Sequence, residues 1–460
     1  MKEKVVIIGA GSAMFTIGLV ADVLAAGLDA ELALVDIDPE ALEVAESVAR
    51  KMVASRGSSV VISASTDRKQ VLPGATAVIC TVGVGGRRGW ERDVFIPRKY
   101  GIFQPVGDTV GPGGTSRALR MIPVMVAIAE DVLALCPRAL FVNYSNPMTA
   151  ICTAIRRATS ANVTGLCHGV GEVEKYLADQ LGVPHSKLNS QAVGLNHLTW
   201  FTKVESGGAD MSGRLEQIAR EKLERQWVEG NLAENFLDNG QWQRPPDEPE
   251  ELNPVSWQLM LSFGAFPAAM DRHVSEFFGL QYLREGSYFG CTLGVDSYSF
   301  ERTIAAGDYE YEIMREQAAE GTELDENIFR HSSGEHEQVI DILQNIRGNR
   351  GGVYSANLPN RGQFDNIPEG AVLESPATAS AEGLRPIRPA QLTGGQAAVI
   401  RNRLEVVELT VQAALECSRE KFVQALVLDG AVESCASAEK MADELLAAQR
   451  DFLPGAWFGE

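Results

Sequence analysis

Short apolar runs alternate with longer segments of helical periodicity along the first third of the chain. Continuous apolar runs predict buried parallel strands at 5–8, 32–35, 60–62, 77–80 and 140–142. The segments between them predict helices at 14–26, 39–51 and 115–135. Because strands and helices alternate, we expect an α/β fold that begins with a doubly wound, Rossmann-like parallel sheet.

The remainder of the chain has a less regular pattern. It predicts strands at 194–204 and 348–358 and helices at 211–226 and 335–346. A polar, proline-rich loop is predicted at 240–254, and a long helical region at 396–449. A chain of 460 residues exceeds what one compact core usually covers. We therefore expect the Rossmann-like domain at 1–195 and a mixed α+β, helix-rich domain at 196–460.

The composition is that of an ordinary folded protein, with 45% apolar and 22% charged residues. A formal net charge of −20 argues against nucleic acid or an anionic membrane surface as a partner. The seven cysteines are odd in number and widely scattered, as in cytosolic proteins. The sequence shows neither a signal peptide nor a membrane-spanning run, so we expect a cytoplasmic location.

A glycine turn follows the first predicted strand. Gly9 and Gly11, followed by Ser12, let the backbone approach a pyrophosphate at the N-terminus of the next helix. The third glycine of the usual pattern is replaced by Met14. Asp36 ends the second strand, where a carboxylate binds both ribose hydroxyls and repels a 2′-phosphate. The turn favours NAD as a cofactor, and a glycine turn that binds no nucleotide is the alternative.

Polar and glycine-rich segments follow the later strands, at the sheet edge where ligands bind in this fold. They lie at 83–88, 92–93, 107–117 and 143–147. Arg87, Arg88 and Arg92 are candidate substrate ligands, and a solvated surface pair is the alternative for the first two. Asn146 offers a donor and an acceptor to a sugar hydroxyl or to nicotinamide. Its alternative role is in the turn before a proline.

Two further segments contain metal-binding residue types. Cys167-His168-Gly169-Val170 is followed about thirty residues later by Gly194-Leu195-Asn196-His197. A thiolate and an imidazole are good ligands for borderline-soft metals. Each segment alone is more typical of a structural role, since most cysteines and histidines bind no metal.

The combination of these motifs resembles glycoside hydrolase family 4, the NAD- and metal-dependent glycosidases. The resemblance extends from the N-terminal glycine turn through Asn-Pro, Cys-His-Gly-Val and Gly-Leu-Asn-His to the late segment 271–273, Asp-Arg-His. It implies that Cys167 and His197 hold a divalent metal, commonly Mn²⁺, whereas ligand type alone favours zinc or iron. This family does not use the two-carboxylate mechanism of most glycosidases.

The resemblance also implies roles for the remaining candidates. Asp271 would be the catalytic base, with helix capping as its alternative, and His168 would act as general acid. His273 would bind substrate or orient the base. Family members that act on 6-phosphorylated sugars carry Asp or Asn where this chain has His168, so unphosphorylated substrates are expected. Cys-His-Gly-Val resembles the members that cleave α-galacturonides, and an arginine would then bind the uronate carboxylate.

The chemistry implied is elimination followed by addition. NAD⁺ would accept a hydride from C3 of the sugar, the metal would stabilise the enediolate, and a base would remove the C2 proton. The glycosidic oxygen would leave, water would add, and the retained NADH would return its hydride. NAD would thus be recycled in each turnover.

Other activities fit parts of the pattern. A lactate- or malate-type NAD-dependent dehydrogenase shares the sheet but needs no Cys167 beside His197. A non-catalytic NAD-binding module would need neither residue. Within the family, α-glucuronidase, α-galactosidase and α-glucosidase activities are the alternatives. The helix-rich region is compatible with a homodimer or homotetramer.

Overall fold

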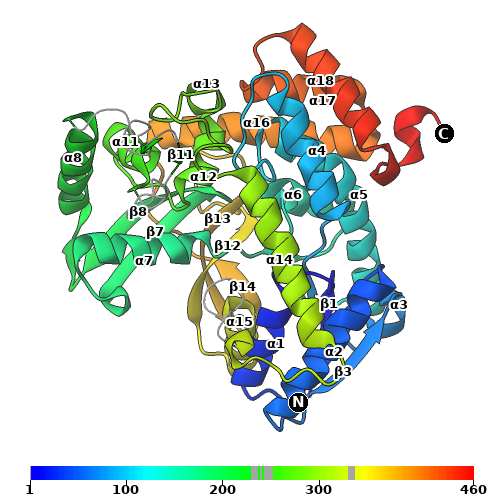
Figure 1. Ribbon diagram of the computed structural model, residues 1–460. Coiled ribbons are helices and arrows are strands. Elements are labelled where there is room, and N and C mark those ends of the chain that lie inside the picture. Colours follow the sequence, from blue (N-terminus) through cyan, green and yellow to red (C-terminus); the bar gives the residue numbers. More distant parts are fainter. Residues whose placement is uncertain (1, 229–236, 239–240, 243–251, 330–336) are drawn as a thin grey trace.

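The computed structural model describes residues 2–228, 237–238, 241–242, 252–329 and 337–460 (Figure 1). Most of the polar loop predicted at 240–254 lies outside these residues, as does the start of the helix predicted at 335–346. No helix in the described ranges is both long and apolar enough to cross a membrane.

A 12-stranded sheet forms the centre of the molecule, and six of its neighbouring strands are parallel. In spatial order these strands are β3 (Val61–Ser65), β2 (Ala30–Val35), β1 (Glu3–Ile8), β4 (Ala77–Cys80), β5 (Leu140–Asn143) and β6 (Val163–Gly165). The order 3-2-1-4-5-6 is that of a doubly wound dinucleotide-binding fold. The predicted α/β class is confirmed.

The apolar runs of the parallel strands are buried on both faces. Val6 and Ile8 of β1 belong to one core cluster, whereas Val5 and Ile7 belong to another. Successive side chains of a strand point to opposite faces, so each face of β1 contacts a different layer of helices. This explains why the strands read as continuous apolar runs instead of alternating ones.

The sheet continues into an antiparallel half through β6. Strand β6 pairs with β12 (Gly352–Pro359), which pairs with β13 (Val372–Ser380), and β13 pairs with β7 (Leu188–Leu195). Beyond it lie β8 (Leu198–Ser206) and β9 (Ala209–Asp210), while β14 (Gly383–Pro386) pairs with β13. The residues predicted as one strand at 194–204 instead form the end of β7, a two-residue turn and most of β8. The domain boundary predicted at 195/196 falls at this turn and stays a prediction.

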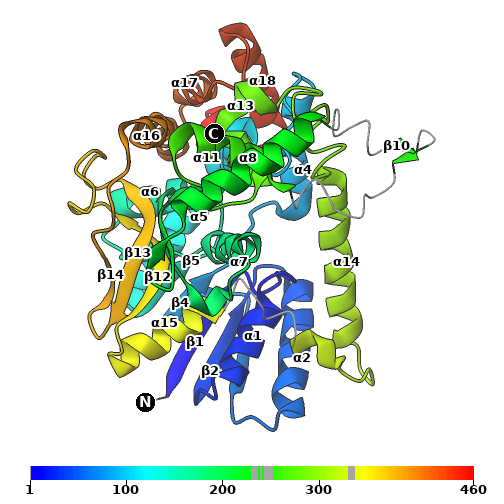
Figure 2. The ribbon, with the colours of Figure 1, turned by 90° about the vertical axis from the view of Figure 1, so that its left-hand side faces the viewer.

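Helices cover both faces of the parallel half (Figures 1 and 2). Those of the N-terminal part are α1 (Thr16–Ala25), α2 (Pro39–Ser55), α3 (Arg68–Val71), α4 (Gly86–Arg98), α5 (Gly111–Leu135), α6 (Met148–Ala158) and α7 (Gly169–Leu181). The later ones are α8 (Ser212–Val228), α11 (Pro254–Phe263), α12 (Asp271–Val274), α13 (Gly279–Tyr282), α14 (Phe300–Ala318), α15 (Glu337–Gly348), α16 (Gly394–Glu416), α17 (Arg419–Asp429) and α18 (Cys435–Ala448). Short 3₁₀ turns lie at His185–Lys187, Ser275–Phe278, Glu326–Phe329, Arg450–Phe452 and Gly455–Phe458, and a two-strand ribbon pairs β10 (Leu237–Asp238) with β11 (Gln241–Trp242).

The C-terminal helices pack on the N-terminal half of the molecule. Helix α16 contacts α5 and α6, and α18 contacts α4, while α14 lies along α2 and α4 (Figure 2). Helix α4 occupies a region that the sequence pattern presented as a loop, so its arginines face neighbouring helices. Three predicted substrate residues, Arg87, Arg88 and Arg92, lie on this helix.

Candidate active site

The glycine turn after β1 brings its backbone next to the carboxylate that ends β2. Gly9 has φ 93°, and a Cβ there would lie 2.8 Å from the Thr81 backbone, so only glycine fits. The Gly11 N–H donates to Asp36 Oδ2 at 2.8 Å. Ser12 lies in the loop before α1. This helix begins at Thr16, two residues after its predicted start at residue 14. The turn packs closely against β2 and β4, and its predicted role in binding a dinucleotide stays a prediction.

Three side chains from distant parts of the chain form a candidate metal site. One ligand atom each from Asp108, His197 and His273 lie within 4.8 Å of one another. The ring centroids of the two histidines are 3.9 Å apart. Asp108 lies in the loop before α5, His197 in the β7–β8 turn and His273 in α12. We call these three residues the metal-binding cluster.

Hydrogen bonds orient two members of the cluster. The Thr109 hydroxyl donates to Asp108 Oδ1 at 2.7 Å and lies 2.9 Å from His197 Nδ1. A hydroxyl that donates to the carboxylate accepts from the Nδ1–H of the imidazole, which makes Nε2 the candidate ligand atom of His197. The Asn146 amide donates to Asp108 Oδ2 at 2.9 Å. Asn146, predicted to bind cofactor or substrate, therefore lies beside the cluster.

The surroundings favour neutral histidine at position 273. Burial, and after it the nearby His197, Arg272 and His168, keep the pKa of His273 well below its usual value. Neutral imidazole is the form that binds a metal. His168, which caps α7, is thus within electrostatic reach of the cluster, and its Nε2 lies 3.5 Å from Glu172 Oε2.

The cluster fits the divalent metal that the resemblance implies. A carboxylate oxygen with two imidazole nitrogens suits manganese better than a thiolate does. Asn146 Oδ1 is buried and has no hydrogen-bond partner in the described part of the chain. A buried acceptor of this kind next to Asp108 needs a donor or a cation to satisfy it.

Cys167 is not a member of this cluster. The thiol is buried, and its Sγ accepts a hydrogen bond from the Gly169 N–H at 3.4 Å. Of the predicted ligand pair, His197 lies in the cluster with Asp108 and His273. The ligand role of Cys167 stays a prediction, and His273 moves from a substrate residue to a candidate ligand.

Asp271, predicted to be the base, is fully buried at the start of another helix. Its carboxylate accepts hydrogen bonds from the Val255 and Ser256 N–H groups at 2.7 and 2.8 Å, at the N-terminus of α11. It also accepts from the Ser256 and Tyr288 hydroxyls at 2.6 and 2.9 Å. Burial raises the pKa of Asp271, and these donors oppose that shift. Both oxygens are occupied, so the geometry supports the capping role and not that of a base.

The three arginines predicted to bind substrate contact other helices. Arg87 Nε and Arg88 Nη2 each donate to the Asp308 carboxylate of α14 at 2.5 Å. Arg92 Nη1 donates to the Ala448 carbonyl of α18 at 2.6 Å. Because these residues lie on α4 and not in a loop, they join helices together. Their predicted substrate role is not supported.

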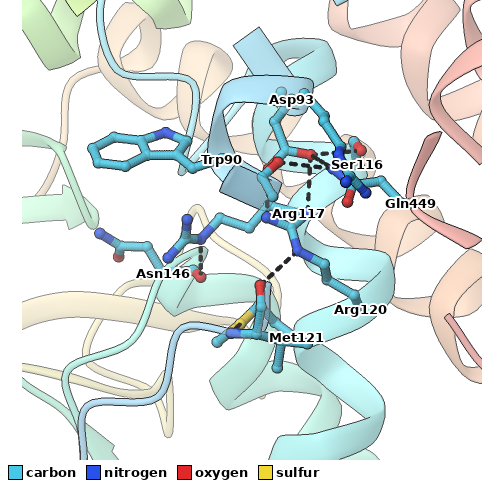
Figure 3. Close-up of polar contacts among 12 residues, drawn as sticks. Trp90, Asp93, Ser116, Arg117, Arg120, Met121, Asn146 and Gln449 are labelled. Carbon is cyan, nitrogen blue, oxygen red and sulfur yellow. Dashed lines mark hydrogen bonds and ion pairs between the residues drawn. The ribbon is translucent and has the colours of Figure 1, made fainter. Parts of the chain in front are cut away.

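A different arginine lies at the candidate site. Arg117 Nε donates to the Asn146 carbonyl at 3.0 Å, and the guanidinium lies 5.7 Å from the Trp90 ring centroid. Figure 3 shows Arg117 beside Trp90, with its hydrogen bond to the backbone oxygen of Asn146. Among the described residues, its terminal amino groups have no hydrogen-bond partner. Burial lowers the pKa of Arg117, and Asp108 opposes this shift.

A buried ion pair holds the helix that carries Arg117. Asp93 of α4 and Arg120 of α5 are both fully buried and lie 2.6 Å apart. Ser116 Oγ and Gln449 Nε2 each donate to Asp93 Oδ1 at 2.8 Å (Figure 3). Burial raises the pKa of Asp93 although Arg120 opposes it. This pair joins α4, α5 and the C-terminal segment beneath the site.

A second buried carboxylate holds the loop that carries Asp108. Glu276 Oε1 accepts hydrogen bonds from the Val106 and Gly107 N–H groups, both at 2.8 Å. Burial raises the pKa of Glu276 to about 8. The sequence singled out 107–117 as site material, but it did not single out Asp108, Thr109 or Arg117, and it gave no signal for Glu276.

Known proteins match this chain over almost its whole length. A model described as family 4 glycosyl hydrolase matches residues 4–183, and one described as its C-terminal domain matches residues 192–432. The α-glucosidase of Erwinia rhapontici is 30% identical and covers 98% of this chain and 99% of its own. The α-galacturonidase of Thermoanaerobacterium saccharolyticum is also 30% identical, with coverage of 84% and 82%.

Solved structures show the same fold. A putative glucosidase, lplD from Bacillus subtilis, is 26% identical with a TM-score of 0.82 and covers 97% of this chain and 100% of its own. A 6-phospho-α-glucosidase from gut microorganisms, in complex with NAD and Mn²⁺, is 20% identical with a TM-score of 0.80 and 99% coverage of both chains. Malate dehydrogenase from Cryptosporidium parvum, at 15% identity, has a TM-score of 0.52 and covers 90% of this chain and 99% of its own.

The family resemblance read from the motifs is therefore confirmed, and it extends through both halves of the sheet. Two adjoining matches together account for most of the chain. The chain belongs to the family 4 glycosyl hydrolases and is a glycosidase.

Proposed function

We propose that this glycosidase depends on NAD and a divalent metal, most suitably Mn²⁺, and cleaves unphosphorylated α-galacturonides. The observation that carries the proposal is the metal-binding cluster of Asp108, His197 and His273, which Asn146 connects to the sheet edge where the nucleotide turn lies. NAD⁺, as hydride acceptor, and the metal ion would then both contact the same bound sugar.

The nucleotide turn supports NAD as the cofactor. A Cβ at Gly9 or Gly11 would clash with neighbouring protein atoms, so the two glycines let the turn pack closely before α1, where a pyrophosphate would bind. Asp36 lies beside this turn, where the ribose hydroxyls would bind. A solved relative of the same fold binds NAD and Mn²⁺. Bound NAD would supply a hydride acceptor for C3 of the sugar, and a bound divalent ion would polarise the C2 and C3 oxygens.

The chain's own residues would bind and orient the sugar. Asn146 offers its buried Oδ1 to a sugar hydroxyl, while its amide group keeps Asp108 in place. His168, partly exposed at the N-terminus of α7, would hold the proton that the leaving oxygen takes. Asp271 would hold α11 in place instead of removing the C2 proton.

Arg117 supports an anionic substrate. Its guanidinium presents two terminal amino groups beside Asn146, and a planar fork of this kind matches a carboxylate. Similar proteins include α-galacturonidases as well as an α-glucosidase. The resemblance of the Cys-His-Gly-Val segment, with His168 in second place, also implies an unphosphorylated substrate. The α-glucuronides, α-galactosides and α-glucosides are the competing substrates.

The lactate- or malate-type dehydrogenase expected as the alternative shares only its fold with this chain, which the family match makes a glycosidase. That activity would not need the metal-binding cluster. The cytoplasmic location and the homodimeric or homotetrameric assembly stay predictions from the sequence.

Aryl α-glycosides test the proposal. We expect phenol release from an aryl α-galacturonide that requires both NAD⁺ and Mn²⁺ and produces no net NADH. The matched α-galactoside, α-glucoside and α-glucuronide should react more slowly. Phenol release without NAD⁺ and Mn²⁺ would contradict the cofactor assignment. Preference for a neutral sugar would contradict the substrate class.

A further inference from the structure

A carboxylate is buried in the antiparallel half of the sheet, directly behind the turn that carries His197. Glu374 of β13 is 1% exposed and pairs with Gly194 of β7. Its Oε2 accepts a hydrogen bond from Asn196 Nδ2 at 3.1 Å, and its Oε1 accepts one from Ser355 Oγ at 3.1 Å. The carboxylate thus lies between β12 and the tip of the β7–β8 hairpin.

Burying the Glu374 carboxylate costs desolvation free energy, so the residue is expected to do more than fill space in the core. Burial raises the pKa of Glu374 to about 7, and hydrogen bonds from Asn196, Ser355 and Asn357 oppose the shift. These donors are neutral amides and a hydroxyl. An apolar residue would pack at this position without the desolvation that a carboxylate requires.

The turn that Glu374 contacts has a strained backbone. Leu195 pairs with Leu198, so Asn196 and His197 are the two central residues of a tight hairpin turn. His197 has φ 67°, in the left-handed region that non-glycine residues seldom adopt. Such a conformation persists only where surrounding contacts enforce it, and the Asn196 side chain is the part of the turn that Glu374 holds.

We propose that Glu374 is a positioning residue: by binding the Asn196 amide, it holds the strained turn so that His197 reaches Asp108 and His273. The inference rests on the metal site of the proposed function. Its chemistry is that of an outer-shell group, which touches no metal but fixes a residue that does. Thr109 orients the His197 ring from the other side.

Mn²⁺ titration of the metal-free protein tests this role by calorimetry, with no substrate and no measurement of activity. We expect Glu374→Ala to weaken Mn²⁺ binding roughly 10- to 100-fold. Asn196→Ala removes the same hydrogen bond from the other partner and should weaken binding similarly. Glu374→Gln keeps a carbonyl acceptor for Asn196 and should restore most of the affinity. Ser355→Ala, which removes the other bond to the carboxylate, is the matched control and should bind like wild type.

Melting temperatures show whether each variant folds, and the Mn²⁺ affinities decide whether Glu374 positions His197. Mn²⁺ affinity that stays at the wild-type level in Glu374→Ala and Asn196→Ala would overturn the proposal, whatever the melting temperatures do. An equal loss of affinity in Ser355→Ala would also overturn it. If Glu374→Ala does not fold, Asn196→Ala decides alone. A wild-type protein that binds no Mn²⁺ would instead refute the metal site itself, and the inference with it.

Discussion

The Asn146 side-chain amide donates to the Asp108 carboxylate at 2.9 Å and thereby joins the loop after β5 to the loop before α5. The backbone carbonyl oxygen of Asn146 also accepts a hydrogen bond from Arg117 Nε. One residue thus connects a candidate metal ligand with a candidate substrate ligand. The proposed metal site and the proposed substrate site therefore share this residue.

The ligand set is tested by exchanging single ligand atoms. Asp108→Asn keeps the size of the side chain but removes its charge, so we expect Mn²⁺ affinity to fall by roughly 100-fold or more, beyond what outer-shell changes cause. NAD affinity should stay unchanged. Calorimetry with each ligand measures both.

Cys167→Ser is the paired variant for that experiment. Because Cys167 lies outside the cluster, the variant should retain more Mn²⁺ affinity than Asp108→Asn. The opposite order would support the predicted ligand role of Cys167 and contradict the larger contribution of Asp108.

The substrate class is tested at Arg117. Loss of a charge-assisted hydrogen bond in Arg117→Met should lower kcat/KM for an aryl α-galacturonide by on the order of 100-fold. The same variant should change kcat/KM for the α-galactoside much less. Arg88→Met is the control, since Arg88 binds Asp308 on the neighbouring helix. Equal losses on both substrates would give Arg117 a positioning role instead.

The role of Asp271 is tested by stability. Asp271→Ala leaves the first N–H groups of α11 and the Tyr288 hydroxyl without their acceptor. We expect the free energy of unfolding to fall by on the order of 3 kcal/mol, as judged from chemical denaturation. A variant that is as stable as wild type but inactive would instead support the catalytic base.

Glu276 should make stability depend on pH. Burial raises its pKa to about 8 from 4.5, so the folded protein keeps a proton that the unfolded chain loses. The free energy of unfolding therefore falls as pH rises from about 5 through about 8. Glu276→Gln keeps an acceptor for the Val106 and Gly107 N–H groups without titrating. Its melting temperature relative to wild type should rise across this interval, and a constant difference would contradict the account.

The sequence predicted the parallel half of the fold because its strands are buried on both faces and show it as apolar runs. It also placed Gly9, Gly11 and Asp36 correctly at the turn, since these residues follow a local pattern. The strands of the antiparallel half of the sheet were predicted less accurately. The Asn196–His197 turn contains no glycine, and a single strand was predicted across it.

The site residues were harder to assign because their roles depend on distant partners. Arg88 and Arg117 both lie near glycine-rich segments, and only the position of α14 shows that Arg88 has an acidic partner there. Asp271 lies two residues before His273, yet it binds α11 while His273 lies in the cluster. Spacing alone cannot separate such neighbours.

Isotope incorporation tests the central claim most directly. In D₂O with NAD⁺ and Mn²⁺, hydrolysis of an aryl α-galacturonide should give galacturonate that carries deuterium at C2, because the C2 proton is removed during cleavage. The product is analysed by proton NMR. Galacturonate released with hydrogen retained at C2 would contradict the proposed redox-assisted elimination.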